Sequence, residues 1–213
     1  MKIKIIFLIV GIFASACTAI FSAPPTPTVA PTATATRAPT FRTDCDTAWR
    51  NVPRAWNDSA PVASPNGKWI ATIHNAQNNP RIMIERADKT GTAVSVPAPN
   101  ASFPLAGLAW SPTSEWLAFS NFIVSGGGGT IYLIKPDGTT LRKIAEYVGF
   151  YDQVAWAPDA QMLAFTSGVN RSARPGGGSS SAFVDSYKIY RIKITGTAMP
   201  EPVADGCAPV WTP

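Results

Sequence analysis

The residue types that most often carry catalysis or hold a metal ion are scarce in this chain of 213 residues. There is one histidine, His74, and an imidazole that acts as a base or a ligand needs partner side chains that the surrounding sequence does not show. A Gly-x-Ser-x-Gly elbow, a His-Glu-x-x-His motif and a zinc-type Cys-x-x-Cys pair are missing. The glycine runs Gly126–Gly129 and Gly176–Gly178 lack the Lys-Ser/Thr ending of a phosphate loop and indicate hairpin connections. We therefore expect no catalytic residue, no metal, no cofactor and no enzyme activity.

The first residues have the pattern of an export signal. Lys2 and Lys4 precede an apolar run from Ile5 to Ala14 that is short for a membrane-spanning helix. The run ends in Ala-Ser-Ala-Cys, which resembles a bacterial lipobox, although the position three before the cysteine is usually leucine and here is Ala14. We expect residues 1–17 to be a signal peptide with a lipobox and Cys17 to be the lipidated residue. The alternatives are an ordinary secretory signal cleaved after Ala-x-Ala, or a lone membrane anchor.

A segment of biased composition follows the signal. Of the eighteen residues from Ala23 to Thr40, sixteen are Pro, Thr or Ala, so the segment has almost no apolar surface to bury. Such chains stay extended, at about 3.1 Å per residue. We expect residues 18–43 to be a disordered tether and residues 44–213 to form one domain. Without Lys2 and Lys4, 16 of the 18 basic residues stand against 13 acidic ones, and no basic run remains to bind nucleic acid.

The cysteines fit an oxidising compartment. If Cys17 carries lipid, Cys45 and Cys207 remain as an even pair in an exported chain. We predict a Cys45–Cys207 disulfide that links the start of the domain to its end. Two buried free thiols are the alternative.

A thirteen-residue pattern occurs twice. LAWSPTSEWLAFS starts at Leu108 and VAWAPDAQMLAFT starts at Val154, 46 positions later. A weaker copy starts at Val62, and Pro209–Pro213 begins a fourth. Periods of 40 to 50 residues are typical of arrays and propellers. Alternating apolar residues between turn signals predict strands, at 69–74, 81–86 and 92–96 in the first unit, 106–110, 116–121, 130–135 and 140–145 in the second, and 162–167 and 187–193 in the third.

These motifs resemble the repeat of TolB-type (WD40-like) β-propellers. The resemblance rests on Trp110-Ser-Pro, Leu117-Ala-Phe and the Ile131–Gly138 stretch, and it covers about residues 60–213. It implies an all-β propeller of four-stranded antiparallel blades. Two units depart from the pattern: the first has Ala63 in place of the tryptophan, and the third reads Asp159-Ala where Asp-Gly is usual. TolB's own role is not implied, since a Pro/Thr-rich segment stands where TolB has its N-terminal α/β domain.

The recurring tryptophans predict how the blades adhere. Trp110, Trp156 and Trp211 occupy the same place in three units, and large rings in register favour packing between blades over ligand binding. The units amount to three blades and part of a fourth, whereas propellers usually have at least four blades. Either strands from Asp44–Trp56 complete the fourth blade, or the chain is a truncated piece of a longer propeller.

The function that follows is binding. We expect a lipid-anchored module outside the cytoplasm, facing the periplasm or cell exterior, that scaffolds another envelope protein or a wall component. Loops carry the binding residues of rigid scaffolds, and the candidate contacts are Phe150, Tyr151, Arg171, Arg174 and Phe183. One alternative is the propeller of a larger exported protein such as a prolyl-oligopeptidase-type peptidase. Another is a glycan or small-ligand sensor, which would expose Trp49, Trp56 or Tyr151.

Overall fold

The computed structural model describes residues 38–45, 57–76, 78–122, 128–147, 154–170, 184–195 and 199–211, with backbone only at 169–170 and 184–185. All of them lie in the second of the two units into which the chain divides, Ala35–Pro213. In the described residues no helix is long and apolar enough to cross a membrane.

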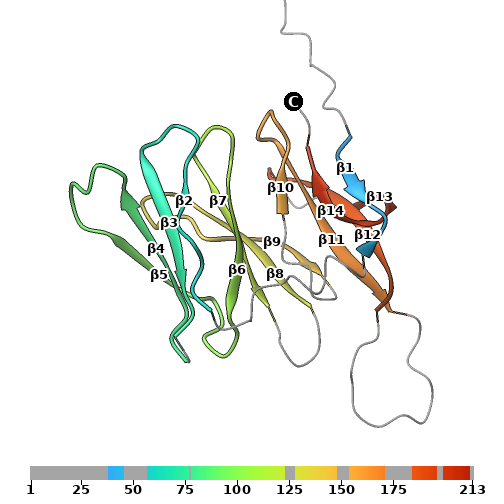
Figure 1. Cartoon of the computed structure of the whole chain (residues 1–213), viewed down its shortest axis with the longest axis horizontal. Helices are drawn as coiled ribbons and strands as arrows, with labels where there is room; N and C mark the ends of the chain where they lie inside the picture. The colour runs from blue at the N-terminus through green and yellow to red at the C-terminus, as the bar shows by residue number, and fades with distance from the viewer. Residues whose placement is uncertain are drawn as a thin grey trace, which may run out of the picture. The chain divides into compact units, whose positions relative to one another are not determined.

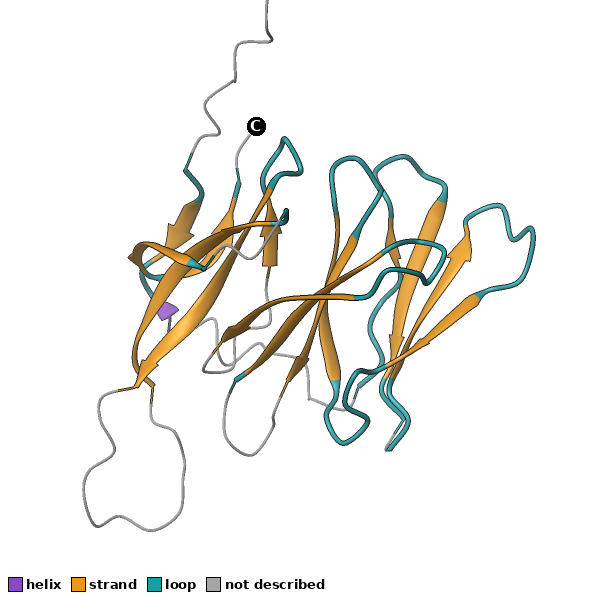
Figure 2. Cartoon of the chain, turned by 180° about the vertical axis from the view of Figure 1, so that it is seen from behind, coloured by secondary structure: helices purple, strands orange, loops and turns teal. Residues whose placement is uncertain are grey.

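Consecutive strands pair antiparallel into three four-stranded sheets, and the first and last strands pair antiparallel into a two-stranded sheet (Figures 1 and 2). The first sheet contains β2 (Val62–Ala63), β3 (Trp69–His74), β4 (Arg81–Arg86) and β5 (Val94–Pro97). The second contains β6 (Leu105–Trp110), β7 (Leu117–Phe122), β8 (Gly129–Ile134) and β9 (Arg142–Tyr147). The third contains β10 (Val154–Trp156), β11 (Met162–Asn170), β12 (Val184–Lys193) and β13 (Glu201–Asp205), and the fourth pairs β1 (Thr40–Arg42) with β14 (Cys207–Val210).

The predicted first and second sheets are close to the observed ones, and their largest differences have a local cause. The strands predicted at 92–96 and 140–145 begin two residues too early, because β5 and β9 start only at Val94 and Arg142. An aspartate holds the preceding turn in each case. The carboxylate Oδ1 of Asp88 accepts from the amide and hydroxyl of Thr90, and that of Asp137 accepts from the same groups of Thr139. Thr90 and Thr139 therefore belong to Asx turns that lie shortly before the two strands.

The ranges predicted from the sequence did not include five strands: β1, β2, β10, β13 and β14. β13 contains Pro202, which is tolerated because β13 is the edge strand of its sheet. β1 lies inside 18–43, the segment predicted as a tether, and pairs Thr40 with Val210 and Arg42 with Cys207. The strand that joins β14 is thus upstream of the predicted donor Asp44–Trp56, of which residues 46–56 lie outside the described part of the chain.

Side chains of the sheets interdigitate in hydrophobic clusters. One cluster packs Ile73, Ile82 and Ile84 of the first sheet against the second, where Phe119 is fully buried. The next two join the second sheet to the third and the third sheet to Trp211. Alternation along each strand points successive side chains to opposite faces, so the second and third sheets each have one face toward the preceding unit and one toward the following unit.

The three recurring tryptophans lock neighbouring sheets together, as predicted. Each is at least 92% buried, with exposures of 7% for Trp110 and 8% for Trp156 and Trp211. Their indole Nε1–H groups donate to backbone carbonyl oxygens of the preceding sheet's first strand: Trp110 to Val62 at 2.9 Å, Trp156 to Ala109 at 2.9 Å and Trp211 to Ala155 at 3.1 Å. The same bond therefore recurs at each junction between units.

The turn after each first strand also repeats. The third residue after the turn's start has positive φ in all three units: 68° at Gly67, 60° at Ser114 and 57° at Ala160. The amide of each donates back across the turn, to the carbonyls of Ser64, Ser111 and Ala157. The departure from Asp-Gly at Ala160 thus changes the residue and not the turn, at a cost of about 1–2 kcal/mol for a left-handed non-glycine residue.

Candidate binding surface

The sheets have two ends, and different connections lie at each. The turn end is the end of the sheets that carries the turns β2–β3, β4–β5, β6–β7, β8–β9 and β10–β11. We call the loop end the opposite one, where β3 leads to β4 and where one sheet leads to the next (Figure 2). Loops of a rigid scaffold are the usual place for binding residues, so both ends are candidates.

At the loop end two buried asparagines hold the crossing between the first and second sheets. Asn75 and Asn121 are each 5% exposed. The Asn75 Oδ1 accepts from the Leu105 amide and its Nδ2 donates to the Leu105 carbonyl, both at 2.9 Å. Asn121 donates to the Phe103 and Pro104 carbonyls at 2.8 and 3.1 Å. These bonds satisfy the crossing's backbone, so the asparagines act as structural clamps.

The single histidine also lies at this end. His74 Nδ1 is 3.1 Å from the Asp58 Oδ2, and Asp58 Oδ1 accepts from the Asn75 amide at 2.8 Å. The contact joins side chains that lie 16 positions apart in the sequence. In the described ranges no three His, Cys, Asp or Glu side chains gather as metal ligands would.

At the turn end, cations cover half-buried indoles in two consecutive sheets. The Arg86 guanidinium lies 5.9 Å from the Trp69 ring centroid, and Lys135 Nζ lies 5.1 Å from that of Trp116. The positions correspond, because Trp69 is the first residue of β3 and Trp116 immediately precedes β7. These two cation–indole contacts were not predicted from the sequence. The pattern that could have indicated them is a second tryptophan at equivalent positions of two units, with a cation near the end of the following strand.

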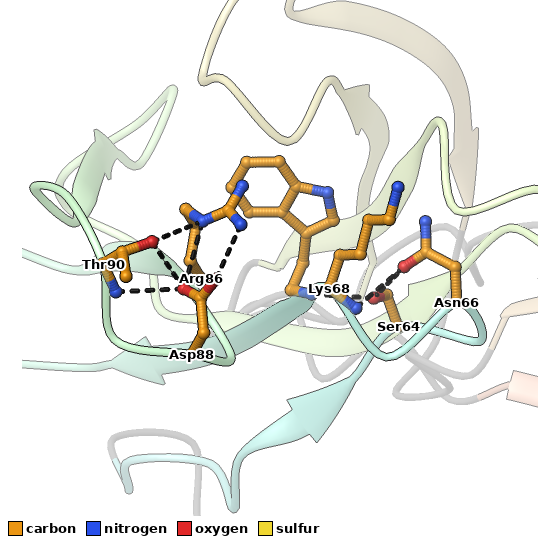
Figure 3. A network of polar contacts seen from close by, with 7 residues as sticks. Ser64, Asn66, Lys68, Arg86, Asp88 and Thr90 are labelled. Atoms are coloured by element: carbon orange, nitrogen blue, oxygen red, sulfur yellow. Dashed lines mark hydrogen bonds and ion pairs between the residues drawn. The ribbon is translucent and has the colours of Figure 1, made fainter.

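The two indole sites differ in charge. Arg86 is paired with Asp88 and also donates to Thr90, as Figure 3 shows together with the neighbouring Ser64, Asn66 and Lys68. The Arg86 hydrogen bond is the main cause that lowers the pKa of the Asp88 carboxyl, and the pKa of Arg86 is raised in turn. The first site is therefore neutralised by its own carboxylate.

The second site holds two cations over one ring. The Arg142 guanidinium lies 5.6 Å from the Trp116 centroid, and its Nη2 donates to the Ile194 carbonyl of the third sheet at 2.8 Å. Trp116, Lys135 and Arg142 are all half-buried. The nearby carboxylate of Asp137 is engaged by Thr139, which lowers its pKa. This arrangement suits an anionic group beside an apolar ring.

The predicted contact residues lie outside the described residues. Phe150 and Tyr151 belong to 148–153, and Arg171, Arg174 and Phe183 belong to 171–183. The described strands that flank them, β9, β10, β11 and β12, reach the loop end, where Gly129 pairs with Tyr147 and Asn170 with Val184. Cys17, Trp49 and Trp56 are also outside the described part.

The predicted disulfide is present. Cys45 and Cys207 are bonded, with their Cα atoms 5.7 Å apart and 162 positions apart in sequence. Cys207 is fully buried and packs with Tyr187 of β12. The bond fixes the segment after β1 to the start of β14, and so ties the two chain segments that form the fourth sheet.

Comparison with known proteins shows a fold and no closer relationship. No protein-family model matches the sequence, and no curated protein matches it either. A prolyl endopeptidase structure matches 71% of this chain and 23% of its own at 13% identity, with a TM-score of 0.51. The β-propeller domain of the trilobed protease from Pyrococcus furiosus, described with an open velcro topology, matches 70% of this chain and 44% of its own at 18% identity and a TM-score of 0.50.

A third similar structure is a putative TolB from Agrobacterium tumefaciens, with 14% identity, 73% of this chain, 53% of the other and a TM-score of 0.47. This chain therefore spans from about a quarter to about half of the proteins it resembles. At such identities the likeness is one of fold alone. The predicted fold class is confirmed: the chain has the all-β architecture of a β-propeller, with three four-stranded blades and a two-stranded fourth sheet.

Proposed function

We propose that the protein is a non-catalytic binding module, exported and held at a membrane by lipid on Cys17, that engages another envelope protein or a wall component. The export signal and the Pro/Thr-rich segment support the location. The Cys45–Cys207 disulfide is compatible with an oxidising compartment. Sheets locked to one another by buried indoles would give such a module a rigid platform.

The observation that best supports a contact surface is the pair of cations on Trp116. An indole flanked by Lys135 and Arg142 offers apolar area and positive charge together. Aromatic and arginine side chains are enriched where proteins bind one another. We therefore propose an acidic segment of a partner protein as the ligand of this surface, with the loop-end residues Phe150, Tyr151, Arg171, Arg174 and Phe183 as a second candidate contact.

Site-specific photo-crosslinking tests the contact. A photo-reactive amino acid at Leu141, which is 45% exposed and adjacent to Arg142, is expected to capture one partner of the envelope. Lys135→Glu should abolish that product by reversing the charge. The matched control is Lys68→Glu, which changes an exposed lysine of the turn between β2 and β3 and should leave the product intact. Capture that survives both substitutions would contradict the Trp116 surface.

A separate experiment tests the anchor. Cys17→Ser should move the protein from the membrane fraction to the soluble exported fraction and should end its labelling by a fatty-acid probe. An unlabelled wild-type protein would contradict lipidation without bearing on the contact surface.

The second candidate function is the propeller part of a larger exported peptidase. The observation that favours it is the prolyl endopeptidase match, of which this chain covers 23%. Coding sequence beyond Pro213 that contains a Gly-x-Ser-x-Gly motif would support it. A glycan or small-ligand sensor is a further candidate, favoured by the half-buried indoles of Trp69 and Trp116; carbohydrate-array binding that is lost in Trp116→Ala and retained in Trp69→Ala would support it.

A further inference from the structure

The indole hydrogen bond that joins neighbouring sheets is replaced in a different way at each end of the stack. Between sheets, a tryptophan N–H reaches the carbonyl of the preceding unit at Val62, Ala109 and Ala155. The equivalent donor position in the first sheet is Ala63, which has no N–H in its side chain and is exposed. The first sheet therefore accepts this bond from the second but has no indole to donate to a unit before it.

Elsewhere on the outward face of the first sheet, the aromatic residues of the second and third sheets are also absent. Cross-strand pairing places Ala63 opposite Ile70 and Thr72 opposite Met83 on the face away from the second sheet. The second sheet has Trp110 opposite Leu117 and Phe119 opposite Tyr132 at the equivalent places, and the third has Trp156 opposite Leu163 and Phe165 opposite Tyr190. Both Phe–Tyr pairs are stacked, at centroid distances of 5.5 and 5.8 Å. In the first sheet, small or flexible residues thus replace the aromatics that join blades.

Charged residues complete this face. His74 pairs with Arg81, and Ile70 pairs with Glu85, so the outward face carries an imidazole, a guanidinium and a carboxylate. The corresponding Leu117–Ile134 pair of the second sheet is fully buried. In the described part of the chain, none of the hydrophobic clusters includes a residue of this outward face. A polar outer face is what the terminal unit of a stacked array requires.

At the other side of the stack the acceptor is already engaged. The carbonyl oxygen of Val210 is the equivalent of those of Val62, Ala109 and Ala155. It accepts a hydrogen bond at 3.1 Å from the hydroxyl of Thr40 in β1. The amino-terminal strand thus supplies, through a threonine, the hydrogen bond that an indole makes at the inner junctions.

From these two terminations we infer that the first sheet is a capping blade, whose outward face takes no further blade from this chain or from a second copy. The described sheets therefore form a stack whose first edge is finished. This inference is independent of the proposed function, but it limits where a partner binds. A partner engages the turn end, the loop end or the outer strands, and it does not add itself as another blade.

Matched glutamate substitutions test the cap in the full-length chain. Thr72 lies on the outward face of the first sheet. Phe119, 47 residues later at the equivalent position, lies on the face of the second sheet that points to the first. Thr72→Glu is expected to lower the melting temperature by less than about 2 °C, as surface substitutions do. Phe119→Glu should abolish cooperative unfolding. In sedimentation velocity, Thr72→Glu should leave the oligomeric state of the wild type unchanged.

Methionine oxidation tests the exposure of the outward face in the wild-type protein, so this test does not depend on whether a variant folds. Met83 lies on the outward face and is half-buried, and Met199 is 84% exposed. With hydrogen peroxide, Met83 should be converted to the sulfoxide at a rate within about tenfold of that of Met199. Strong protection of Met83 would overturn the inference, as would a wild-type dimer that Thr72→Glu dissociates, or a Thr72→Glu variant that unfolds as Phe119→Glu does.

Discussion

The indole Nε1–H of Trp156 donates to the carbonyl oxygen of Ala109 at 2.9 Å, across the junction between the second and third sheets. Ala109 immediately precedes Trp110, whose own indole makes the same bond to the first sheet. Each tryptophan therefore adjoins the acceptor for the next, and the junctions form one continuous series.

This series predicts how the tryptophans contribute to stability. Trp156→Phe, which removes the N–H and part of the ring, should lower the free energy of unfolding by at least about 1 kcal/mol. Trp156→Ala should cost about 3–5 kcal/mol, because it also leaves a cavity between two sheets. Urea unfolding followed by circular dichroism measures both. Trp69→Ala, at a half-buried indole that makes no inter-sheet bond of this series, is the control and should cost less; equal losses would contradict the series.

The Asn75 clamp should be important for the crossing between the first two sheets. Asn75→Ala removes both hydrogen bonds to the backbone of Leu105, which is 2% exposed, and buried unpaired groups cost about 1–3 kcal/mol each. We expect a loss of about 2 kcal/mol or more in thermal or urea unfolding. Asn100→Ala, an exposed asparagine in the same crossing, should cost less than about 1 kcal/mol. A reversed order of the two variants would refute the clamp.

Gly138 should be the less replaceable of two turn glycines. Gly67 and Gly138 both have positive φ, 68° and 79°, but a Cβ at Gly67 would meet nothing within 4 Å, whereas at Gly138 it would lie 2.4 Å from Cγ1 of Val94. Gly67→Ala should therefore cost about 1 kcal/mol and Gly138→Ala more. Val94→Ala should partly rescue Gly138→Ala in a double-mutant cycle of unfolding free energies. Additive losses of unfolding free energy would show that the added Cβ does not clash with Val94.

The disulfide should contribute strongly to stability. In the chain-entropy treatment, a loop of 162 residues is worth about 5 kcal/mol. The variant Cys45→Ser/Cys207→Ser, or reduction of the wild type, should therefore lower the midpoint of urea unfolding, and the reducing agent should leave the double variant unchanged. Mass spectrometry without reduction provides the direct check, since two free thiols in the wild type would rule the bond out.

Acid should weaken the turn that Asp88 holds. The folded-state pKa of Asp88 is depressed, chiefly by its hydrogen bond to Arg86, so this contribution to stability is present above the unfolded-state pKa near 4 and is lost as the pH falls toward the lower folded-state value. Asp88→Asn should be less stable than wild type at pH 7, and the two should converge as the pH falls below about 4. Both groups are solvent-exposed, so the difference should shrink in high salt. A difference that stays constant from pH 7 to pH 2 would exclude this linkage.

The sequence alone was sufficient to predict the fold class, because the same motif recurs in successive units. Trp110, Trp156 and Trp211 recur in register, and only a repeated contact between like units requires the same large ring at the same place. The strands at Trp69–His74 and Arg81–Arg86 were predicted to the residue, since alternation of apolar side chains is a local property. The pairing of Cys45 with Cys207 followed from an even count of cysteines in an exported chain.

Only the tertiary structure showed which segments form the fourth sheet. It also showed which face of the first sheet is left without a neighbouring blade in the described part of the chain. Thr40–Arg42 begins at the last residue of the Pro/Thr/Ala-rich stretch and has no strand pattern, and it is a strand only because the edge of β14 offers it backbone partners. The cations on Trp116 come from the end of β8 and the start of β9, whose proximity depends on the turn between them. Pairing between distant segments and the covering of a face are properties of the packed chain, and a pattern of neighbours along the sequence does not contain them.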